Sequence, residues 1–218
     1  MQIAIDGPAG AGKSSVAKRI AEALNILYID TGAMYRAITW KALHTGLSIE
    51  DQPAIEALAE HTRLDLKKDN QGLQVWCDDM EVTDAIRTPE VSRMVSRVSS
   101  YPGVRTAMVG QQQALGRRSD VVMDGRDITH VVLPEANYKF YFTASLEERA
   151  RRRALELEAK GLQVDLAQLT REIGERDRQD MERTVGPLKV ASDAIVIDTS
   201  GLTEDQVVDR VLDIVRGR

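Results

Sequence analysis

Residues 7–14 read GPAGAGKS. It matches the pattern G-x-x-x-x-G-K-[ST] at every fixed position and follows the apolar residues Ile3-Ala4-Ile5. The spacing of Val16, Ile20 and Leu24 predicts a helix that begins inside the motif. Because strand, glycine-rich loop and helix stand in the right order, the pattern favours a nucleoside triphosphate site over a chance glycine-rich turn.

Each residue type in this loop suits phosphate. Glycines let successive backbone N–H groups wrap an anion, and the N-terminus of the following helix adds positive potential. We expect Lys13 to reach the β- and γ-phosphates and the hydroxyl of Ser14 to bind Mg²⁺. The predicted donor contacts in the loop are Gly7, Pro8, Ala9, Gly10, Ala11, Gly12, Lys13, Ser14 and Ser15.

Composition narrows the class of protein. The 218 residues are 43% apolar and 29% charged, which is typical of a globular chain with one sizeable core. A net charge of −5 argues against a general nucleic-acid or membrane-surface binder. The single cysteine, Cys77, is interpreted as an unpaired thiol, and the absence of a leader pattern and of a long apolar run suggests a cytoplasmic protein.

Short, mostly continuous apolar runs alternate with helical patterns along the chain. Such runs mark strands buried on both faces, so we expect a three-layer α/β fold around a central parallel five-stranded sheet, in one domain over 1–218. The predicted strands are 2–5, 27–29, 121–123, 139–142 and 194–197. The predicted helices are 13–24, 33–43, 104–115, 146–160 and 207–215, with capping boxes at Ser145–Glu148 and Thr203–Gln206 and a stop at Gly161.

Residues 63–87 break this rhythm. Polar and apolar residues alternate there around a turn signal at 69–72, which predicts a small antiparallel insert. The insert is either an arm over an acceptor substrate or a loop elaboration without function.

Several arginines stand at predicted strand-to-helix junctions, where the carboxyl ends of parallel strands place ligand sites. They are Arg36, Arg105 and Arg126, the last within Asp124-Gly-Arg-Asp127. Arginine suits phosphate because its planar fork makes bidentate hydrogen bonds, although a structural ion pair is the alternative for each one singly.

Two further basic groups lie in the C-terminal third. Arg176, Asp180 and Arg183 share one helical face, either as a phosphate and sugar clamp or as a solvated charged surface. Residues 149–153 contain Arg149, Arg151, Arg152 and Arg153, which are either solvated surface or a lid over the donor phosphates.

These parts suffice for phosphoryl transfer, which requires Mg²⁺, aligned reactants and cations around the moving group. Asp124, at the end of an apolar strand, is the candidate for holding the hydrated Mg²⁺. No general base is evident in the sequence. A phosphate acceptor needs none, because its oxygen is already ionised at neutral pH.

Taken together, the motifs resemble the bacterial cytidylate kinases over nearly the full length. The residues that carry the resemblance are GPAGAGKS, Asp30-Thr-Gly-Ala-Met-Tyr-Arg36, Tyr101-Pro-Gly-Val-Arg105 with Ser96, Asp124-Gly-Arg-Asp127, Glu175-Arg-Asp-x-x-Asp180-x-x-Arg183 and Pro187-Leu-Lys-x-Ala-x-Asp-Ala194. The resemblance implies a P-loop NTPase fold, transfer of the γ-phosphate of ATP to CMP or dCMP, Mg²⁺, and a monomer.

The resemblance also implies roles for single residues. Ser96, Arg105 and Asp127 would contact cytosine, and Arg36 and Arg126 the acceptor phosphate. Arg176, Asp180 and Arg183 would hold ribose or phosphates. Thr31, Tyr35 and Asp124 complete the expected acceptor set, Arg152 the donor set, and Lys13, Arg126, Arg176 and Arg183 the catalytic set. An enlarged monophosphate-binding insert would occupy about 60–100, and a mobile lid about 146–168.

Two departures stand out. Thr129 replaces the glycine that the family more often has after the Asp124–Asp127 segment, which could stiffen that loop or shift Asp127; Thr31 stands where some members carry serine. His130 is interpreted as a surface or supporting residue, since phosphoryl transfer to a phosphate gives it no proton to move.

Other function classes remain as alternatives. One is a kinase for a different small acceptor, such as another monophosphate or a shikimate-like hydroxyl, and another is a nucleotide-sequestering or RNA-binding protein without turnover. A GTPase switch is disfavoured because no Asn-Lys-x-Asp segment occurs.

Overall fold

The computed structural model describes residues 1–69, 72–159 and 161–217. The chain forms two compact units, which we describe one at a time. The first comprises Met1–Tyr28 and the chain from Ser119 onward, and the second comprises Ile29–Arg118. Within the described residues, no helix is long and apolar enough to cross a membrane.

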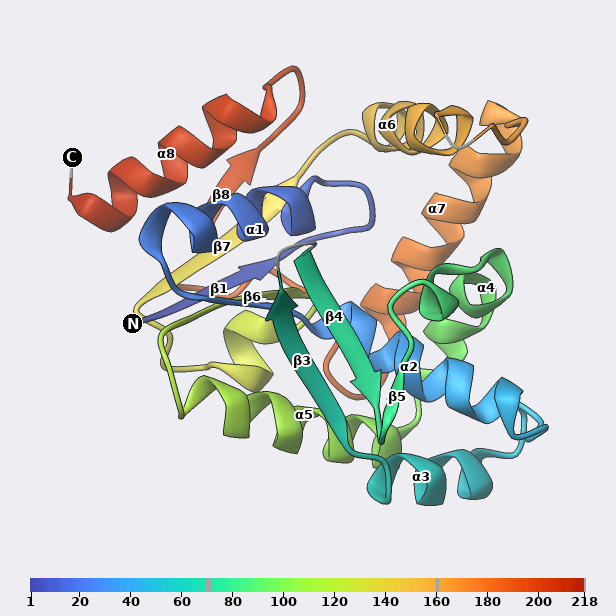
Figure 1. Cartoon of the computed structure of the whole chain (residues 1–218). Helices are drawn as coiled ribbons and strands as arrows, with labels where there is room; N and C mark the ends of the chain where they lie inside the picture. The colour runs from blue at the N-terminus through green and yellow to red at the C-terminus, as the bar shows by residue number, and fades with distance from the viewer. Residues whose placement is uncertain (70–71, 160, 218) are drawn as a thin grey trace. The chain divides into compact units, whose positions relative to one another are not determined.

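A five-stranded sheet organises the first unit (Figure 1). Its order is β2 (Leu27–Asp30), β6 (Val121–Gly125), β1 (Gln2–Asp6), β7 (Tyr138–Thr143) and β8 (Ile195–Asp198). β1 pairs in parallel with β6 and β7, and β7 pairs in parallel with β8. All five predicted strands are therefore confirmed, each within one or two residues.

The core of this unit lies between the sheet and two helices, α1 (Lys13–Leu24) and α8 (Glu204–Arg216). Alternate residues of the central strands point into it, and α1 contributes the predicted apolar stripe. The side chains that pack together include Ile3, Ile5, Val16, Ile20, Phe140, Phe142, Val208 and Val211. Each such buried side chain stabilises the fold by about 1.5–3 kcal/mol.

Two further helices, α6 (Leu146–Glu158) and α7 (Leu166–Glu182), pack against each other. At the start of α6, Ser145 Oγ accepts from Glu148 N at 3.2 Å, but the Glu148 carboxylate turns to arginines instead of completing the capping box. The capping box of Thr203 and Gln206 at α8 is complete. Gly161 has φ +77°, in keeping with a helix stop, while Lys160 lies outside the described residues.

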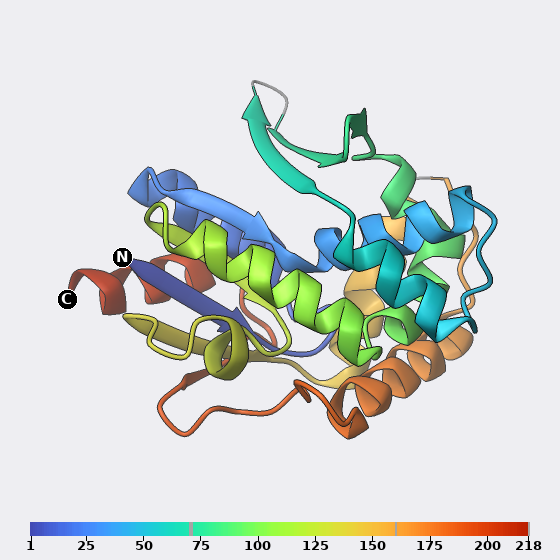
Figure 2. The ribbon, with the colours of Figure 1, turned by 90° about the horizontal axis from the view of Figure 1, so that it is seen from below.

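The second unit combines helices with a small antiparallel sheet. Its helices are α2 (Thr31–His44), α3 (Gln52–Glu60), α4 (Pro89–Val98) and α5 (Pro102–Gly116), with the short helix η1 (Ala85–Arg87). β3 (Leu64–Asp69), β4 (Gly72–Cys77) and β5 (Met80–Glu81) pair in antiparallel order. Figure 2 shows the β3–β4 pair standing out from the helices of this unit.

The antiparallel insert predicted at 63–87 is thereby confirmed. The turn signal at 69–72 includes Asn70 and Gln71, which lie outside the described residues. Cys77 on β4 is unpaired as predicted, and burial raises the pKa of its thiol to about 11, so it is not a reactive thiolate.

Candidate active site

The phosphate-binding loop joins β1 to α1 as its sequence predicts. A side chain on Gly7, where φ is +150°, would place its Cβ 2.1 Å from the backbone oxygen of Phe142. At Gly10, with φ +78°, a Cβ would lie 3.0 Å from the Cβ of Arg149. Two of the glycines are therefore required by close packing against β7 and α6 as well as by backbone conformation.

Lys13 is buried over its own loop. Its Nζ donates to the Pro8 carbonyl at 2.8 Å. Burial, helped by the positive charge of Arg126, lowers the pKa of Lys13 to about 7, against the opposing influence of Asp124, Asp6 and Asp180. The ammonium of Lys13 is therefore easier to deprotonate than that of an exposed lysine.

The predicted magnesium residues meet at the end of β6. Ser14 Oγ donates to Asp124 Oδ2 at 2.7 Å, and the hydroxyl of Tyr28 donates to Asp124 Oδ1 at 2.9 Å. Tyr28 was not predicted; it immediately precedes the buried end of β2.

An arginine cluster surrounds Asp180 on α7. Arg126 Nε donates to Asp180 Oδ2 at 2.7 Å, and Arg183 Nη1 lies 3.8 Å from Asp180 Oδ1. Although burial opposes the effect, the charges of Arg126, Arg176 and Arg183 lower the pKa of Asp180. The same carboxylate raises the pKa of Arg126 against its burial, so both groups are ionised. The structure thus brings together the predicted residues of this unit that lie far apart in sequence.

Asp127 and His130 follow β6. Arg183 Nη2 lies 3.6 Å from Asp127 Oδ1, which adds this carboxylate to the cluster. Burial lowers the pKa of His130, although Asp127 opposes it, and a neutral histidine fits the supporting role predicted for it.

The four arginines of 149–153 divide into two pairs. Arg151 and Arg153 form ion pairs with Glu148 and Glu156 on the surface of α6. Arg149 and Arg152 instead face the phosphate-binding loop. The cluster thus contains two surface arginines and two that face the loop. A lid over the donor phosphates stays a prediction.

Arg149 is an internal anchor of the loop. Its Nη1 donates to the Ala9 carbonyl at 3.0 Å and to Asp177 Oδ2 at 2.5 Å, and its Nε donates to the Ala144 carbonyl at 3.0 Å. Asp177 also accepts from Ala9 N at 3.3 Å. Asp177 lies one residue after Arg176 in the quoted motif, but its spacing alone did not show that it faces inward.

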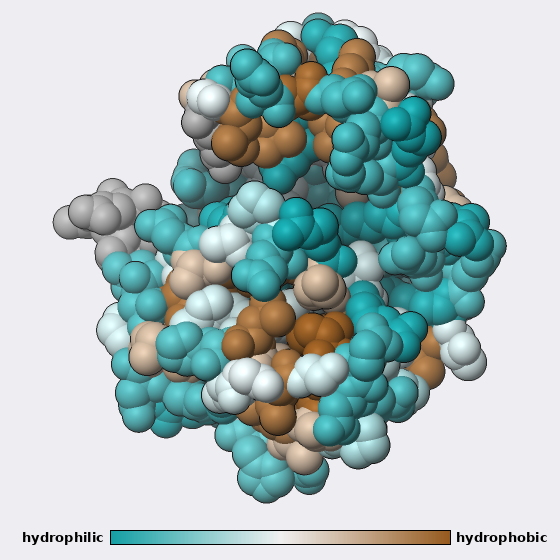
Figure 3. Space-filling model, turned by 90° about the vertical axis from the view of Figure 1, so that its right-hand side faces the viewer, coloured by the Kyte–Doolittle hydropathy of each residue, from teal (hydrophilic) through white to brown (hydrophobic). Residues whose placement is uncertain are grey.

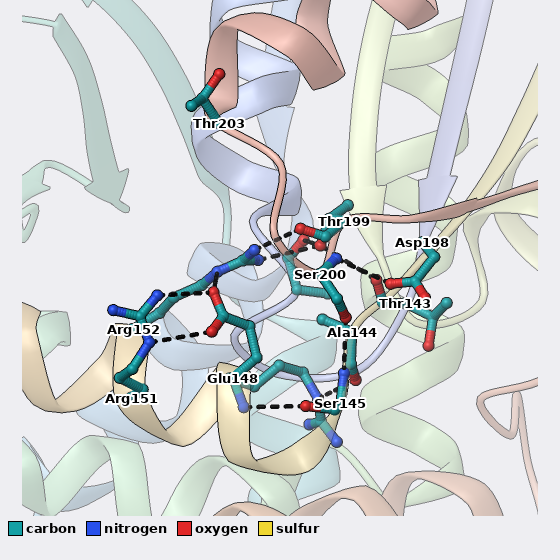
Figure 4. Close-up of polar contacts among 12 residues, drawn as sticks. Thr143, Ala144, Ser145, Glu148, Arg151, Arg152, Asp198, Thr199, Ser200 and Thr203 are labelled. Atoms are coloured by element: carbon teal, nitrogen blue, oxygen red, sulfur yellow. Dashed lines mark hydrogen bonds and ion pairs between the residues drawn. The ribbon is translucent and has the colours of Figure 1, made fainter.

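Arg152 is held by α6 and by the end of β8 (Figure 4). Its Nε donates to Glu148 Oε1 at 2.9 Å, its Nη1 to Thr199 Oγ1 at 3.0 Å and its Nη2 to the Thr199 carbonyl at 2.5 Å. Thr199 Oγ1 also lies 3.2 Å from the carbonyl oxygen of Ala11 in the loop. Thr199 was missed, although its place just after a parallel strand is the signal that identified Asp124.

In the second unit the predicted acceptor residues lie on α2, α4 and α5. Asp30 caps α2 by accepting from Ala33 N at 2.8 Å, and it also accepts from Arg36 Nη2 at 3.0 Å. The Nε of Arg36 is buried without a hydrogen-bond partner among the described residues. Thr31 is buried at the start of α2.

Arg105 is almost fully buried in the first turns of α5. Its Cζ lies 5.5 Å from the ring centroid of Tyr35, and its Nη1 donates to the Ser99 carbonyl at 3.2 Å. Ser96 is half-buried on α4. Gln112, which shares a helical face with Arg105, was not predicted; both of its amide atoms are buried without a partner in the described part of the chain.

Comparisons with known proteins extend this description. A family model described as cytidylate kinase matches residues 3–217. Cytidylate kinase of Desulforamulus reducens is 53% identical over 210 residues, which cover 96% of this chain and 94% of the relative. Cytidylate kinase of Exiguobacterium sibiricum is 52% identical over 217 residues, with 100% and 97% covered.

Two solved structures share the fold at low identity. An uncharacterized protein from Eubacterium ventriosum has a TM-score of 0.56 at 14% identity, with 100% of this chain and 99% of that one covered. Shikimate kinase from Bacteroides thetaiotaomicron has a TM-score of 0.50 at 11% identity, with 99% and 98% covered. These confirm the predicted α/β fold, whereas the match over nearly the whole length to relatives at about half identity shows more: the chain belongs to the cytidylate kinase family and is a nucleoside monophosphate kinase.

Proposed function

We propose that the chain transfers the γ-phosphate of ATP to CMP and dCMP, giving ADP and the nucleoside diphosphate. The observation that carries this proposal is the cluster of Arg126, Arg176 and Arg183 around Asp180 in the unit that holds Lys13. Two phosphate groups must approach each other against their repulsion, and guanidinium groups gathered around them offset that repulsion.

On the donor side, the proposal assigns the triphosphate to the loop 7–15. Backbone N–H groups and the start of α1 hold its phosphates, and Lys13 moves from the Pro8 carbonyl to the anion. Binding of that anion raises the pKa of Lys13 again, because a negative charge nearby favours the charged ammonium. Arg152 adds a guanidinium beside the loop.

The donor set also fits Mg²⁺. Ser14 and Asp124 supply hard oxygen donors 2.7 Å apart, and magnesium is ordinarily held by one or two carboxylates together with substrate phosphates and water. We propose that these two residues hold the ion, either by direct coordination or through water molecules bound to it. When bound, Mg²⁺ neutralises charge on the phosphates and orients them.

On the acceptor side, we propose that Arg126, Arg176 and Arg183 act on the transferring phosphate and that Asp180 orients them and the sugar. Asp127 accepts a hydrogen bond from the exocyclic amine of cytosine. From the second unit, the resemblance assigns acceptor contacts to Thr31, Tyr35, Arg36, Ser96 and Arg105. The Nε of Arg36 has no partner in the described part of the chain, which supports its assignment because a donor is left for an anion.

Two segments would close over the nucleotides. We propose that residues 146–168 form a lid and that residues 60–100 form the monophosphate-binding insert. Leu155, Leu162 and Leu166 are each about half exposed at 54%, 48% and 49%, and Figure 3 shows apolar side chains gathered over the end of α6 and the start of α7. Such a surface gains stability when closure covers it, and closure keeps water from the donor phosphate.

We also propose that the chain acts as a monomer in the cytoplasm. Sedimentation of the purified protein at assay concentration tests the first statement, and fractionation of cells that produce it tests the second.

The function is tested by ADP release from ATP and Mg²⁺ with one acceptor at a time: CMP, dCMP, UMP, AMP, GMP or shikimate. We expect rapid turnover with CMP and dCMP alone and loss of turnover in Lys13→Ala, while the exposed Lys18→Ala control on the same helix keeps it. Turnover only with another acceptor would refute the acceptor assignment. Nucleotide binding without any turnover would favour a sequestering protein.

A further inference from the structure

Asp6 is a buried carboxylate that the proposed reaction does not use. It is the last residue of β1 and stands directly before Gly7 of the phosphate-binding loop, with no exposed surface. Its carboxylate accepts three hydrogen bonds: from Ile128 N and Thr129 N at 2.8 Å each, and from Thr129 Oγ1 at 2.6 Å.

These donors begin the turn η2 (Ile128–Val132), which has π-helical geometry. The first N–H groups of a helical turn have no partner within the turn, and an isolated turn this short is not stable. Asp6 satisfies two of them from 122 and 123 residues away in sequence. The carboxylate therefore ties the turn to the end of β1.

The cost of burying this acid shows that the contact is not incidental. Burial raises the pKa of Asp6 to about 6, even though the hydrogen bonds from Thr129 and Ile128 lower it. A neutral, apolar side chain would avoid that cost but could not accept the three hydrogen bonds from Ile128 and Thr129.

The turn follows directly on Arg126 and Asp127, the two residues of this loop to which the proposed function gives acceptor contacts. Fixing Ile128 and Thr129 fixes the chain direction immediately after Asp127. Because Asp6 is continuous with the phosphate-binding loop, the same hydrogen bonds set the distance between donor and acceptor residues within the first unit.

We propose that Asp6 and Thr129 are positioning residues, which together brace the Arg126–Asp127 segment against the phosphate-binding loop. The hydroxyl of Thr129 adds a third hydrogen bond that a glycine at this position could not make. Compared with glycine, threonine at position 129 restricts the backbone and adds a side-chain contact to the Asp6 carboxylate. The inference rests on the proposed function for its effect on CMP, but the brace itself can be measured separately.

The test compares Thr129→Val, which keeps the shape without the hydroxyl, with Thr129→Ser, which keeps the hydroxyl. We expect the valine variant to raise the KM for CMP about tenfold and to narrow the CMP-to-UMP preference, with the KM for ATP within about twofold. The serine variant should restore both values. Thr45→Val, which removes an exposed hydroxyl bonded only to α2 carbonyls, is the matched control and should behave like the wild type.

An equal rise in the KM values for CMP and ATP, no change in either, or failure of serine to restore them would overturn the proposal. If the valine variant does not fold, Thr129→Gly replaces it in the same comparison. Amide hydrogen exchange at Ile128 gives a readout without turnover: we expect about tenfold faster exchange without the hydroxyl. Unchanged exchange would refute the brace, whereas a wild type that does not phosphorylate CMP would refute only the proposed function.

Discussion

Replacing Asp177 by asparagine should destabilise the protein more than removing any surface charge. The side chains of Arg149 and Asp177 are 8% and 9% exposed and lie 2.5 Å apart, so water screens their attraction little. The pair also holds both polar groups of one loop residue, since Arg149 donates to the Ala9 carbonyl and Asp177 accepts from Ala9 N.

The magnitude follows from what the substitution leaves behind. Asparagine keeps the size and one oxygen acceptor, but the Arg149 guanidinium stays buried without its counter-charge. Breaking a buried ion pair in this way costs about 3–5 kcal/mol, and because one acceptor remains, we expect Asp177→Asn to cost about 3 kcal/mol. For a chain of this length the melting temperature should fall by about 6–12 °C.

Thermal unfolding followed by circular dichroism measures this effect, and the chain supplies its own control. Arg19 and Asp205 also lie 2.5 Å apart, but their side chains are 40% and 75% exposed. Asp205→Asn should therefore leave the melting temperature nearly unchanged, because exposed pairs contribute little.

The double variant Arg149→Met/Asp177→Asn removes both charges and should be more stable than the sum of the single losses predicts. Equal melting temperatures for Asp177→Asn and Asp205→Asn, or strict additivity in the double variant, would refute the reasoning that a buried, coupled charge pair anchors the loop. The single variant should also raise the KM for ATP, because Ala9 loses its anchor.

Three further predictions concern the loop and the acceptor contacts. The pKa of Lys13 is lowered to about 7, and only its ammonium form attracts phosphate, so kcat/KM for ATP should fall as pH rises through neutrality. Arg126→Ala removes a positive charge that lowers this pKa. In a pH–rate profile, this variant should therefore show the fall at higher pH. Gly7→Ala should destabilise the fold by at least about 2 kcal/mol, because the new Cβ would lie 2.1 Å from the Phe142 carbonyl oxygen, and a normal melting temperature would contradict this. Asp127→Ala should lower the ratio of kcat/KM for CMP to kcat/KM for UMP. An unchanged ratio would show that Asp127 does not recognise the base.

The sheet and its flanking helices could be predicted because their buried positions carry apolar residues at the spacing of strands and helices. The strands of the first unit are mostly continuous apolar runs, and α1 and α8 carry apolar stripes at helical spacing. The expectation that every such strand is buried on both faces is wrong for β8, where Ile195 and Val196 are 41% and 49% exposed. The helix α4 carries the same signal in Val91, Val95 and Val98, with Thr88 as its N-cap, yet it was not predicted. That omission was avoidable.

The helix α7 was harder to predict for a physical reason. Among its 17 residues the buried ones are Ile173, Asp177 and Asp180, so two of the three inward-facing side chains are acidic. Asp177 pairs with Arg149 of α6, and Asp180 pairs with Arg126 after β6. The spacing relates Asp180 to Arg176 and Arg183, but it does not show these partners from other elements. In the sequence, a helix whose buried side chains are charged has the same pattern as a charged helix on the surface. The difference lies in the partners that other elements supply.

The site could be predicted to the extent that its residues belong to motifs. The loop, Asp124, Arg126 and the arginines of α7 were identified from order and spacing. Asp6, Tyr28 and Thr199 were not. Asp6 ends β1 and Thr199 follows β8, so the strand-end rule that pointed to Asp124 applies to both of them. Tyr28 lies inside β2, where that rule does not apply.

Polar residues at the strand ends hold the loops of the first unit through hydrogen bonds within the chain. Asp6 holds the turn after Asp127, Thr199 holds Arg152, and Asp124 holds Ser14. Lys13 is buried beside the phosphate-binding loop, and burial and the charge of Arg126 lower its pKa to about 7. An incoming triphosphate reverses that shift, so near and above neutral pH its binding should be accompanied by proton uptake at this lysine. Loops that are already ordered reduce the conformational entropy lost on binding. The buried lysine makes the binding free energy depend on the negative charge of the ligand.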